Sequence, residues 1–116
     1  MTDQQSGPAE PLGLVENSRG VWTFTADVDL LLRCAAGGFD WVAVDAQHGP
    51  VDRAGLHAIG RAFADAVTPF VVRVPAVDVA WIGAALDAGA AAVIVPSVTG
   101  AADAVLELRE NAHAHL

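Results

Sequence analysis

Short apolar runs recur along this chain at intervals of about 25 residues, and this repetition restricts the possible folds more than any other feature. Each run consists mainly of β-branched, aromatic or small apolar residues, which is the composition of a buried β-strand. Glycine, proline or polar residues interrupt the pattern after each run. We therefore predict four β-strands, at Val21–Ala26, Trp41–Asp45, Phe70–Val74 and Ala91–Val95.

The segments that follow these runs have the features of α-helices. Asp27 and Asp52 precede the first two segments as caps, Asp78 opens the third, and a glycine precedes the fourth. Apolar residues share one face of each segment, and glycines follow the first and third. The predicted helices are Val28–Ala36, Arg53–Ala66, Asp78–Asp87 and Ala101–Asn111. Four consecutive β–α units of this kind predict an α/β fold in which the strands pair in parallel through right-handed crossovers.

Two architectures are compatible with four such units: a small doubly wound sheet, and the first half of an eight-unit (β/α)₈ barrel. The chain has no glycine-rich dinucleotide turn and no phosphate loop, which disfavours a nucleotide-binding sheet. A flavodoxin-like domain would need a fifth strand, which the pattern does not contain. Half a barrel, in turn, would leave open strand edges and uncovered apolar surface.

Composition limits the partners of the chain. Apolar residues make up 53% and charged residues 17%, and the net charge is −8 with no lysine at all. This balance argues against nucleic acid or an anionic membrane as a partner. The single cysteine, Cys34, and the absence of a signal pattern predict a soluble cytoplasmic protein. Residues 1–20 are expected to be a flexible lead-in, and residues 21–116 the α/β unit.

Candidate site residues cluster where two predicted strands end. Asp45, Gln47 and His48 follow the strand Trp41–Asp45, and Arg73 lies near the end of the next one. The carboxyl ends of parallel strands meet on one face, where α/β sites form. We therefore expect these side chains to share a site.

Each candidate has a structural reading beside its functional one. Asp45 could orient the His48 ring for acid–base chemistry, or the pair could simply form a turn. Arg73 must meet an anion, either a structural carboxylate such as Asp45 or, as we favour, a carboxylate or enolate oxygen of a ligand. Gln47 could donate to a substrate oxygen or fill the turn, and Trp22 could line a pocket or the core.

The remaining candidates are weaker. Cys34 fits a helical core position better than a reactive thiol. His57 is expected to be a solvated helix residue, and the His113–His115 pair a frayed terminus with at most adventitious metal binding. No strong metal-binding motif is present in the chain.

Three segments together resemble the HpcH/HpaI aldolase family of the phosphoenolpyruvate/pyruvate barrel superfamily. They are Gly38–Pro50 (GFDWVAVDAQHGP), Val71–Pro75 (VVRVP) and Asp87–Val98 (DAGAAAVIVPSV), in the order and spacing of that family. The resemblance runs from about Val21 to Asn111 and implies the first four units of a (β/α)₈ TIM barrel. It also implies a lyase that cleaves a 4-hydroxy-2-keto acid reversibly to pyruvate and an aldehyde.

The resemblance further implies a role for each site residue. Arg73 matches the arginine that binds the keto or enolate oxygen, and His48 the histidine that handles the proton of the aldehyde-derived hydroxyl. Asp45 matches the aspartate that orients this histidine, and Trp22 lies near a tryptophan that shapes the pocket. A divalent metal, Mg²⁺, Mn²⁺ or Co²⁺, is expected as the cofactor, and a homo-oligomer as the assembly.

Two departures from the family pattern carry consequences. Gln47 stands where the family usually has glutamate, which removes one charge beside His48. The family's metal-ligating Glu and Asp are expected on strands after the fourth, so no metal ligand is assigned in this chain, which is expected to be inactive alone. The alternative function is a non-enzymatic α/β module for oligomerisation or for binding a small carboxylate through Arg73.

Overall fold

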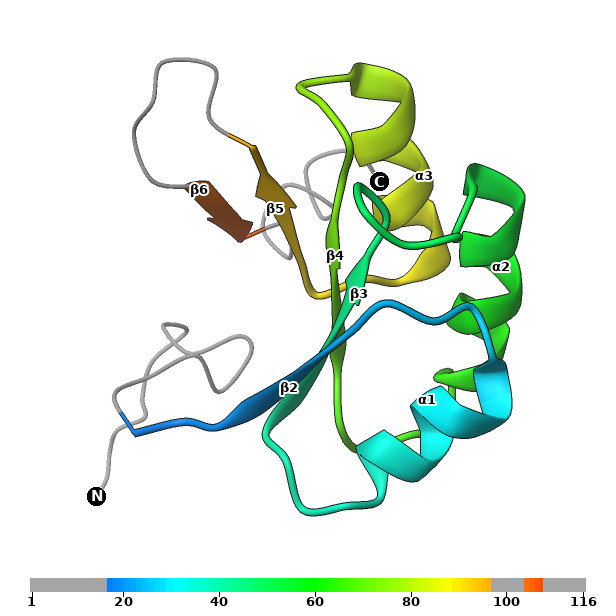
Figure 1. Cartoon of the computed structure of the whole chain (residues 1–116), viewed down its shortest axis with the longest axis vertical. Coiled ribbons are helices and arrows are strands. Elements are labelled where there is room, and N and C mark those ends of the chain that lie inside the picture. Colours follow the sequence, from blue (N-terminus) through cyan, green and yellow to red (C-terminus); the bar gives the residue numbers. More distant parts are fainter. Residues whose placement is uncertain (1–16, 97–103, 108–116) are drawn as a thin grey trace.

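A single twisted sheet forms the centre of the molecule (Figure 1). The computed structural model describes residues 17–96 and the backbone of residues 104–107. The sheet has the strand order β2-β3-β4-β5-β6, so neighbours in the sequence are also neighbours in space. The strands are β2 (Gly20–Thr23), β3 (Trp41–Asp45), β4 (Phe70–Arg73), β5 (Ala92–Val95) and β6 (Ala104–Glu107).

The first four strands run parallel, and a helix follows each of the first three. These helices are α1 (Val28–Ala35), α2 (Arg53–Ala62) and α3 (Val79–Ala88). Each begins at the predicted aspartate, whose side chain accepts a hydrogen bond from backbone N–H groups of the first turn. Gly89 ends α3 with φ of 100°, a conformation that glycine adopts without a steric penalty.

All three helices cover the same face of the sheet (Figure 1). Leu31 of α1, Leu56 and Ile59 of α2 and Ala85 of α3 are buried in one cluster with strand residues such as Val44. A doubly wound sheet would carry helices on both faces, whereas a barrel carries them on the outer face only. The arrangement therefore agrees with consecutive units of a barrel wall.

The opposite face of the sheet holds a second, smaller apolar cluster. Its buried members come from the middle strands and include Ala43, Val71, Ala92 and Ile94, with Trp41 packed against them. Side chains alternate along a strand, so Asp45 and Arg73 lie on this same face, one pleat beyond Ala43 and Val71. The face that would line the inside of a barrel therefore carries the charged residues.

Several predicted boundaries differ from the structure by a few residues. Helix α2 ends at Ala62 rather than Ala66, because the chain then continues in tighter turns, with Ala64 N–H bonded to Arg61 and Ala66 N–H to Phe63. These turns leave the Phe63 ring against Phe70, with centroids 5.1 Å apart. Strand β2 spans 20–23 rather than 21–26.

One predicted helix is wrong where the structure describes it. The sequence pattern placed residues 101–111 in a helix, but Ala104–Glu107 forms strand β6, antiparallel to β5. The physical reason is the open edge of β5, whose backbone N–H and C=O groups gain hydrogen-bond partners from β6. The rest of that predicted helix, and residues 1–16 of the predicted lead-in, lie outside the described residues.

The helices within the described ranges are short. The longest of them have ten residues, and none has the length and apolar content that crossing a membrane would require.

Candidate functional site

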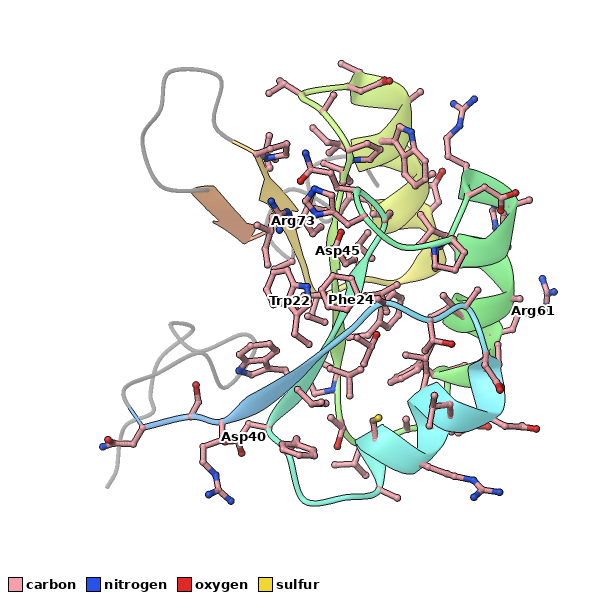
Figure 2. All side chains as sticks on the ribbon, viewed as in Figure 1. Trp22, Phe24, Asp40, Asp45, Arg61 and Arg73 are labelled. Carbon is pink, nitrogen blue, oxygen red and sulfur yellow. The ribbon has the colours of Figure 1, made fainter. Side chains whose placement is uncertain are left out.

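The candidate site lies at the carboxyl ends of β3 and β4, on the sheet face that the helices leave open (Figure 2). Asp45 is the last residue of β3 and Arg73 the last of β4, and the two are direct partners in the register of the sheet. Trp22 reaches the same place from β2, where its backbone partner is Ala43. Three neighbouring strands thus bring together residues far apart in the sequence.

Asp45 is the centre of this site. Its side chain is fully buried, and it accepts hydrogen bonds on both oxygens. Oδ1 accepts from the backbone N–H groups of Gln47 at 2.8 Å and His48 at 2.9 Å. Oδ2 accepts from the Trp22 indole Nε1 at 3.0 Å and lies 3.5 Å from Arg73 Nη1. The carboxylate therefore joins the turn after β3 to residues of β2 and β4.

The surroundings of Asp45 favour its ionised form. Burial by itself raises the pKa of this carboxyl, because it removes water from the charge. Hydrogen bonds from the His48 N–H, the Trp22 indole and the Gln47 N–H, together with the charge of Arg73, outweigh that effect. The pKa of Asp45 is consequently lowered, and the site holds a carboxylate and a guanidinium at neutral pH.

Trp22 and Arg73 also contact each other. The Arg73 guanidinium carbon lies 5.9 Å from the centroid of the Trp22 ring, within the range of a cation–π contact. Trp22 therefore donates to Asp45 with its N–H and meets Arg73 with its ring face. We call these three residues the Trp22–Asp45–Arg73 cluster. The Arg73 side chain remains 22% exposed, so part of it faces the outside of the cluster.

His48 lies beside the cluster but is held through its backbone. Its Nδ1 is 3.8 Å from Asp45 Oδ2, which is too long for a hydrogen bond, and its side chain is 61% exposed. Asp45 instead binds the His48 backbone N–H. The loop position of His48 is thus well defined, while its ring faces solvent above the strand ends.

Gln47 shares the same turn. Its side-chain Oε1 is buried and has no hydrogen-bond partner among the described residues. A buried acceptor of this kind is costly unless a donor reaches it. Gln47 is therefore poised to accept a hydrogen bond from a group that the described residues do not supply.

The other residues singled out in the sequence lie away from this site. Cys34 is half-buried on α1, where it packs against the core. His57 is exposed on α2. His113 and His115 lie outside the described residues.

The described residues do not by themselves fit a divalent metal. They contain no group of three His, Cys, Asp or Glu side chains that could hold an ion. The buried carboxylate of Asp45 already accepts from three N–H donors and faces the Arg73 cation. A metal expected for this chemistry would need ligands from outside the described part of the chain.

Sequence reasoning missed two features that hold the site together. The Trp22–Asp45 hydrogen bond depends on strand register, for which no local pattern exists. Gly49 was interpreted only as a strand breaker, but a Cβ there would collide with the Asp45 carbonyl oxygen and press on that of Phe24. The sequence did contain a signal for this close approach, namely a glycine directly after His48.

A hollow lies at the other end of the sheet from this site. It has a volume of about 700 Å³ and is lined by apolar residues such as Phe63, Pro69, Phe70 and Leu86. These residues lie at the start of β4 or near the ends of α2 and α3. No acid or base lines it, so it is not the site of the chemistry described above.

Known proteins are similar to this chain in sequence over most of its length. The model of the HpcH/HpaI aldolase/citrate lyase family matches residues 18–112. A 4-hydroxy-2-oxovalerate aldolase of Novosphingobium aromaticivorans is 39% identical over 87 residues, which are 73% of this chain and 33% of the relative. A hydroxypyruvate/pyruvate aldolase of Agrobacterium fabrum is 35% identical over 85 residues, 73% of this chain and 32% of the relative.

A solved structure shows the same arrangement. The crystal structure of an HpcH/HpaI aldolase from Desulfitobacterium hafniense aligns with a TM-score of 0.61 at 25% identity, over 70% of this chain and 32% of that one. The chain thus spans about a third of the length of the relatives that it matches. What it shares with them is the parallel sheet with alternating helices.

Proposed function

Because the chain belongs to the HpcH/HpaI aldolase/citrate lyase family, we propose that the complete protein is a carbon–carbon lyase. The reaction is the reversible aldol cleavage of a 4-hydroxy-2-keto acid to pyruvate and an aldehyde. The names of the relatives, 4-hydroxy-2-oxovalerate aldolase and hydroxypyruvate/pyruvate aldolase, support this substrate class. The observation that carries the proposal is the placement of Arg73 beside the buried Asp45 carboxylate, with His48 above the same strand ends.

In this proposal Arg73 binds the keto oxygen of the substrate. Cleavage turns that oxygen into an enolate, and a guanidinium held in place stabilises the charge that develops. Asp45 and the Trp22 ring fix the position of the guanidinium through the contacts described above. A preorganised donor of this kind needs little rearrangement when the charge appears.

His48 acts as the base at the substrate hydroxyl, at the carbon that becomes the aldehyde. Its exposed ring is free to meet a substrate that enters from the open side of the strand ends. Asp45 contributes by fixing the turn through the His48 N–H. Gln47 accepts or donates a hydrogen bond to substrate from the same turn, and Trp22 forms part of the pocket wall.

A divalent metal, Mg²⁺, Mn²⁺ or Co²⁺, belongs to the proposal for the complete protein. Such an ion would act as a Lewis acid on the keto acid. Its ligands are expected outside the described residues, since these do not fit a metal alone. The roles of Arg73, His48 and Asp45 do not depend on which ion is used.

The wider context of the protein is part of the same proposal. A net charge of −8 without any lysine supports a protein that binds neither nucleic acid nor anionic membranes. We further propose a cytoplasmic homo-oligomer with small-molecule substrates.

A second candidate is a module that binds a small carboxylate without cleaving it. The observation that favours it is specific: the described residues offer an arginine site for an anion, yet no group of metal ligands. In that case Arg73 would hold the carboxylate of the ligand by paired hydrogen bonds.

Pyruvate release from 4-hydroxy-2-oxovalerate separates the two candidates. It is measured for the chain and for the complete protein with each metal in turn, with EDTA as the control. The lyase proposal expects turnover by the complete protein that Arg73→Ala reduces about a hundredfold to a thousandfold, the size of loss typical for a donor to an oxyanion.

The matched control is Arg61→Ala. Arg61 is exposed on α2 and points away from the site (Figure 2), so this change should leave turnover intact. Near-normal turnover by the Arg73→Ala variant would remove Arg73 from the mechanism. Pyruvate binding that depends on Arg73 without any turnover of the complete protein would favour the module.

A further inference from the structure

A groove between α2 and α3 lies on the outer surface, away from the strand ends. It has a volume of about 530 Å³ and is lined by residues of both helices. A fourth helix that followed β5 would lie on the side of α3 away from α2, given the order of the strands. The groove would therefore stay open in a continued barrel wall.

Helix α3 is apolar on its outer as well as its inner side. Asp87 is its single charged residue, and the sequence between the caps is otherwise VAWIGAAL and a final alanine. Its inner side packs on the core through Ala85, while Val79, which lines the groove, is 86% exposed. Helices that are apolar all round are normally covered on every side. The outer side of α3 lacks such a cover within the described protomer.

Gly83 lies in the middle of this outer side. A Cβ built there would meet nothing within 4 Å, so the backbone is open to the outside. Ala80 and Ala84 flank it along the groove. Small residues let the backbone of a second helix approach closely, and a helix is the element that fits such a surface.

Two opposite charges lie toward the two ends of the groove. Arg53 begins α2 and Asp87 lies in the last turn of α3, and neither takes part in an ion pair within the described residues. The two helices run parallel, and Gly60 lies directly against the Ala88 carbonyl. Arg53 lies seven residues before Gly60, and Trp81 lies seven residues before Ala88. Arg53 and Trp81 are therefore at the same height along the two parallel helices.

A two-fold rotation centred at Gly83 makes this arrangement self-complementary. It carries Asp87, four residues after Gly83, to the level of Val79 in the partner. Arg53 of the partner subunit lies at the level of Trp81, two residues or about 3 Å along the axis from that point. Each Asp87 thus comes opposite the partner's Arg53, and the two contacts are equivalent, as an isologous interface requires.

From this complementarity we propose that the α2–α3 groove binds the same groove of a second copy of this chain. The two α3 helices cross antiparallel at Gly83, with Val79 covered and two Arg53–Asp87 pairs closing the ends. This gives a surface to the proposed homo-oligomer, and it is independent of the proposed catalysis, because the groove contains no residue of the strand-end site.

Charge reversal tests the pairing directly in the full chain. Arg53→Asp and Asp87→Arg each place like charges opposite one another, so each variant alone should dimerise at least about tenfold more weakly than the wild type. Both changes suit their helix ends, since an acid favours the start of a helix and a base its end, so folding is retained. Sedimentation equilibrium measures the association, and circular dichroism the fold.

Mixing the two single variants provides the sharpest result. A heterodimer of Arg53→Asp with Asp87→Arg has two favourable pairs, so the mixture should regain wild-type association that neither variant shows alone. The double variant should associate with itself but not with the wild type. Recovery of this kind identifies the pair, because other contacts of the chain are unchanged.

A steric variant and a charge control complete the test. Gly83→Leu should prevent dimerisation by filling the crossing point, while it raises the helix propensity of α3. Asp65→Arg, an exposed charge reversal outside the groove, should leave association unchanged. The proposal is overturned if the wild type stays monomeric, if the single variants associate as the wild type does, or if their mixture shows no recovery.

Discussion

At the scale of single residues, Asp45 contacts more groups than its place in the sequence predicted. The expectation was an aspartate that orients the His48 ring, and its role in catalysis stays a prediction. The structure shows a carboxylate that binds the turn backbone, the Trp22 indole and the Arg73 guanidinium at once. The buried Asp45 carboxylate therefore fixes the positions of site residues from β2, from the turn after β3 and from β4.

The ionisation of Asp45 makes stability depend on pH. Its pKa is lowered in the folded chain, so its contribution is complete above the unfolded pKa of about 3.9 and is lost as the pH falls through the folded pKa. Asp45→Asn should lower the free energy of unfolding at pH 7 by about 2 kcal/mol, because charge-assisted hydrogen bonds are lost. It should also flatten the decline below pH 4. Urea titrations from pH 7 to pH 2 measure both effects, and parallel acid limbs in the two proteins would contradict the assignment.

His48 offers a prediction that separates two chemical steps. If its ring takes the proton from the substrate hydroxyl, His48→Ala in the complete protein should reduce aldol cleavage by about a hundredfold or more. Exchange of the pyruvate methyl protons should fall much less, because that step has no aldehyde hydroxyl. Deuterium exchange followed by NMR, beside a pyruvate-release assay, measures the two rates. Equal losses would argue against this role.

At the scale of elements, α2 and α3 meet where glycine is required. A Cβ on Gly60 would collide with the backbone of Ala88, whereas a Cβ on Gly83 would project into open space. The two glycines occupy comparable helix interiors but differ in what faces them. Comparing substitutions at Gly60 and Gly83 separates the effect of the α2–α3 contact on stability from the effect of intrinsic helix propensity.

Gly60→Ala should therefore destabilise the chain by about 1–3 kcal/mol, because the helices must move apart. Gly83→Ala should instead leave the free energy of unfolding unchanged or raise it by up to about 1 kcal/mol, since alanine is the better helix former. Chemical denaturation of both variants measures the difference. Stabilisation by Gly60→Ala would show that α2 and α3 do not approach as closely as described.

The strand β6 shows how an element can be decided by its neighbours. The spacing of Val105 and Leu108 favoured a helix, as local periodicity does for short apolar segments. Instead, residues 104–107 pair with β5. Edge strands present unpaired backbone groups, and pairing them can outweigh a modest helix propensity.

At the scale of the whole molecule, the sheet separates two kinds of surface. One face is packed under α1, α2 and α3, and the other carries the Trp22–Asp45–Arg73 cluster beyond a small apolar patch. The relatives that match this chain in sequence are about three times as long as the part matched. The activity of the complete protein is therefore proposed from one shared third.

Metal binding tests whether the ligands of the expected metal lie outside the described residues. Because the described residues hold no group of three metal-ligating side chains, the chain should bind Mn²⁺ or Co²⁺ no more tightly than its His113–His115 pair allows. A variant with both histidines changed to alanine should give no heat of binding in calorimetry at millimolar ion. Micromolar affinity in that variant would reveal a site that the described residues do not show.

The sequence alone determined the local features of this protein. The aspartate caps at 27, 52 and 78, the stop at Gly89 and the strand Trp41–Asp45 all lie where they were predicted. These features depend on contacts within a few residues, such as a side chain that accepts from the first turn of its own helix. The α/β class follows from their alternation.

Only the tertiary structure decided how these elements combine. It placed α1, α2 and α3 on one face, selected Asp45 among the possible partners of Arg73, brought the Trp22 indole to the same carboxylate, and left the His48 ring exposed. These outcomes depend on strand register and on burial across 20 or more residues of sequence. Local patterns contain no information about such distances, because the energies that decide them arise only when the sheet has formed.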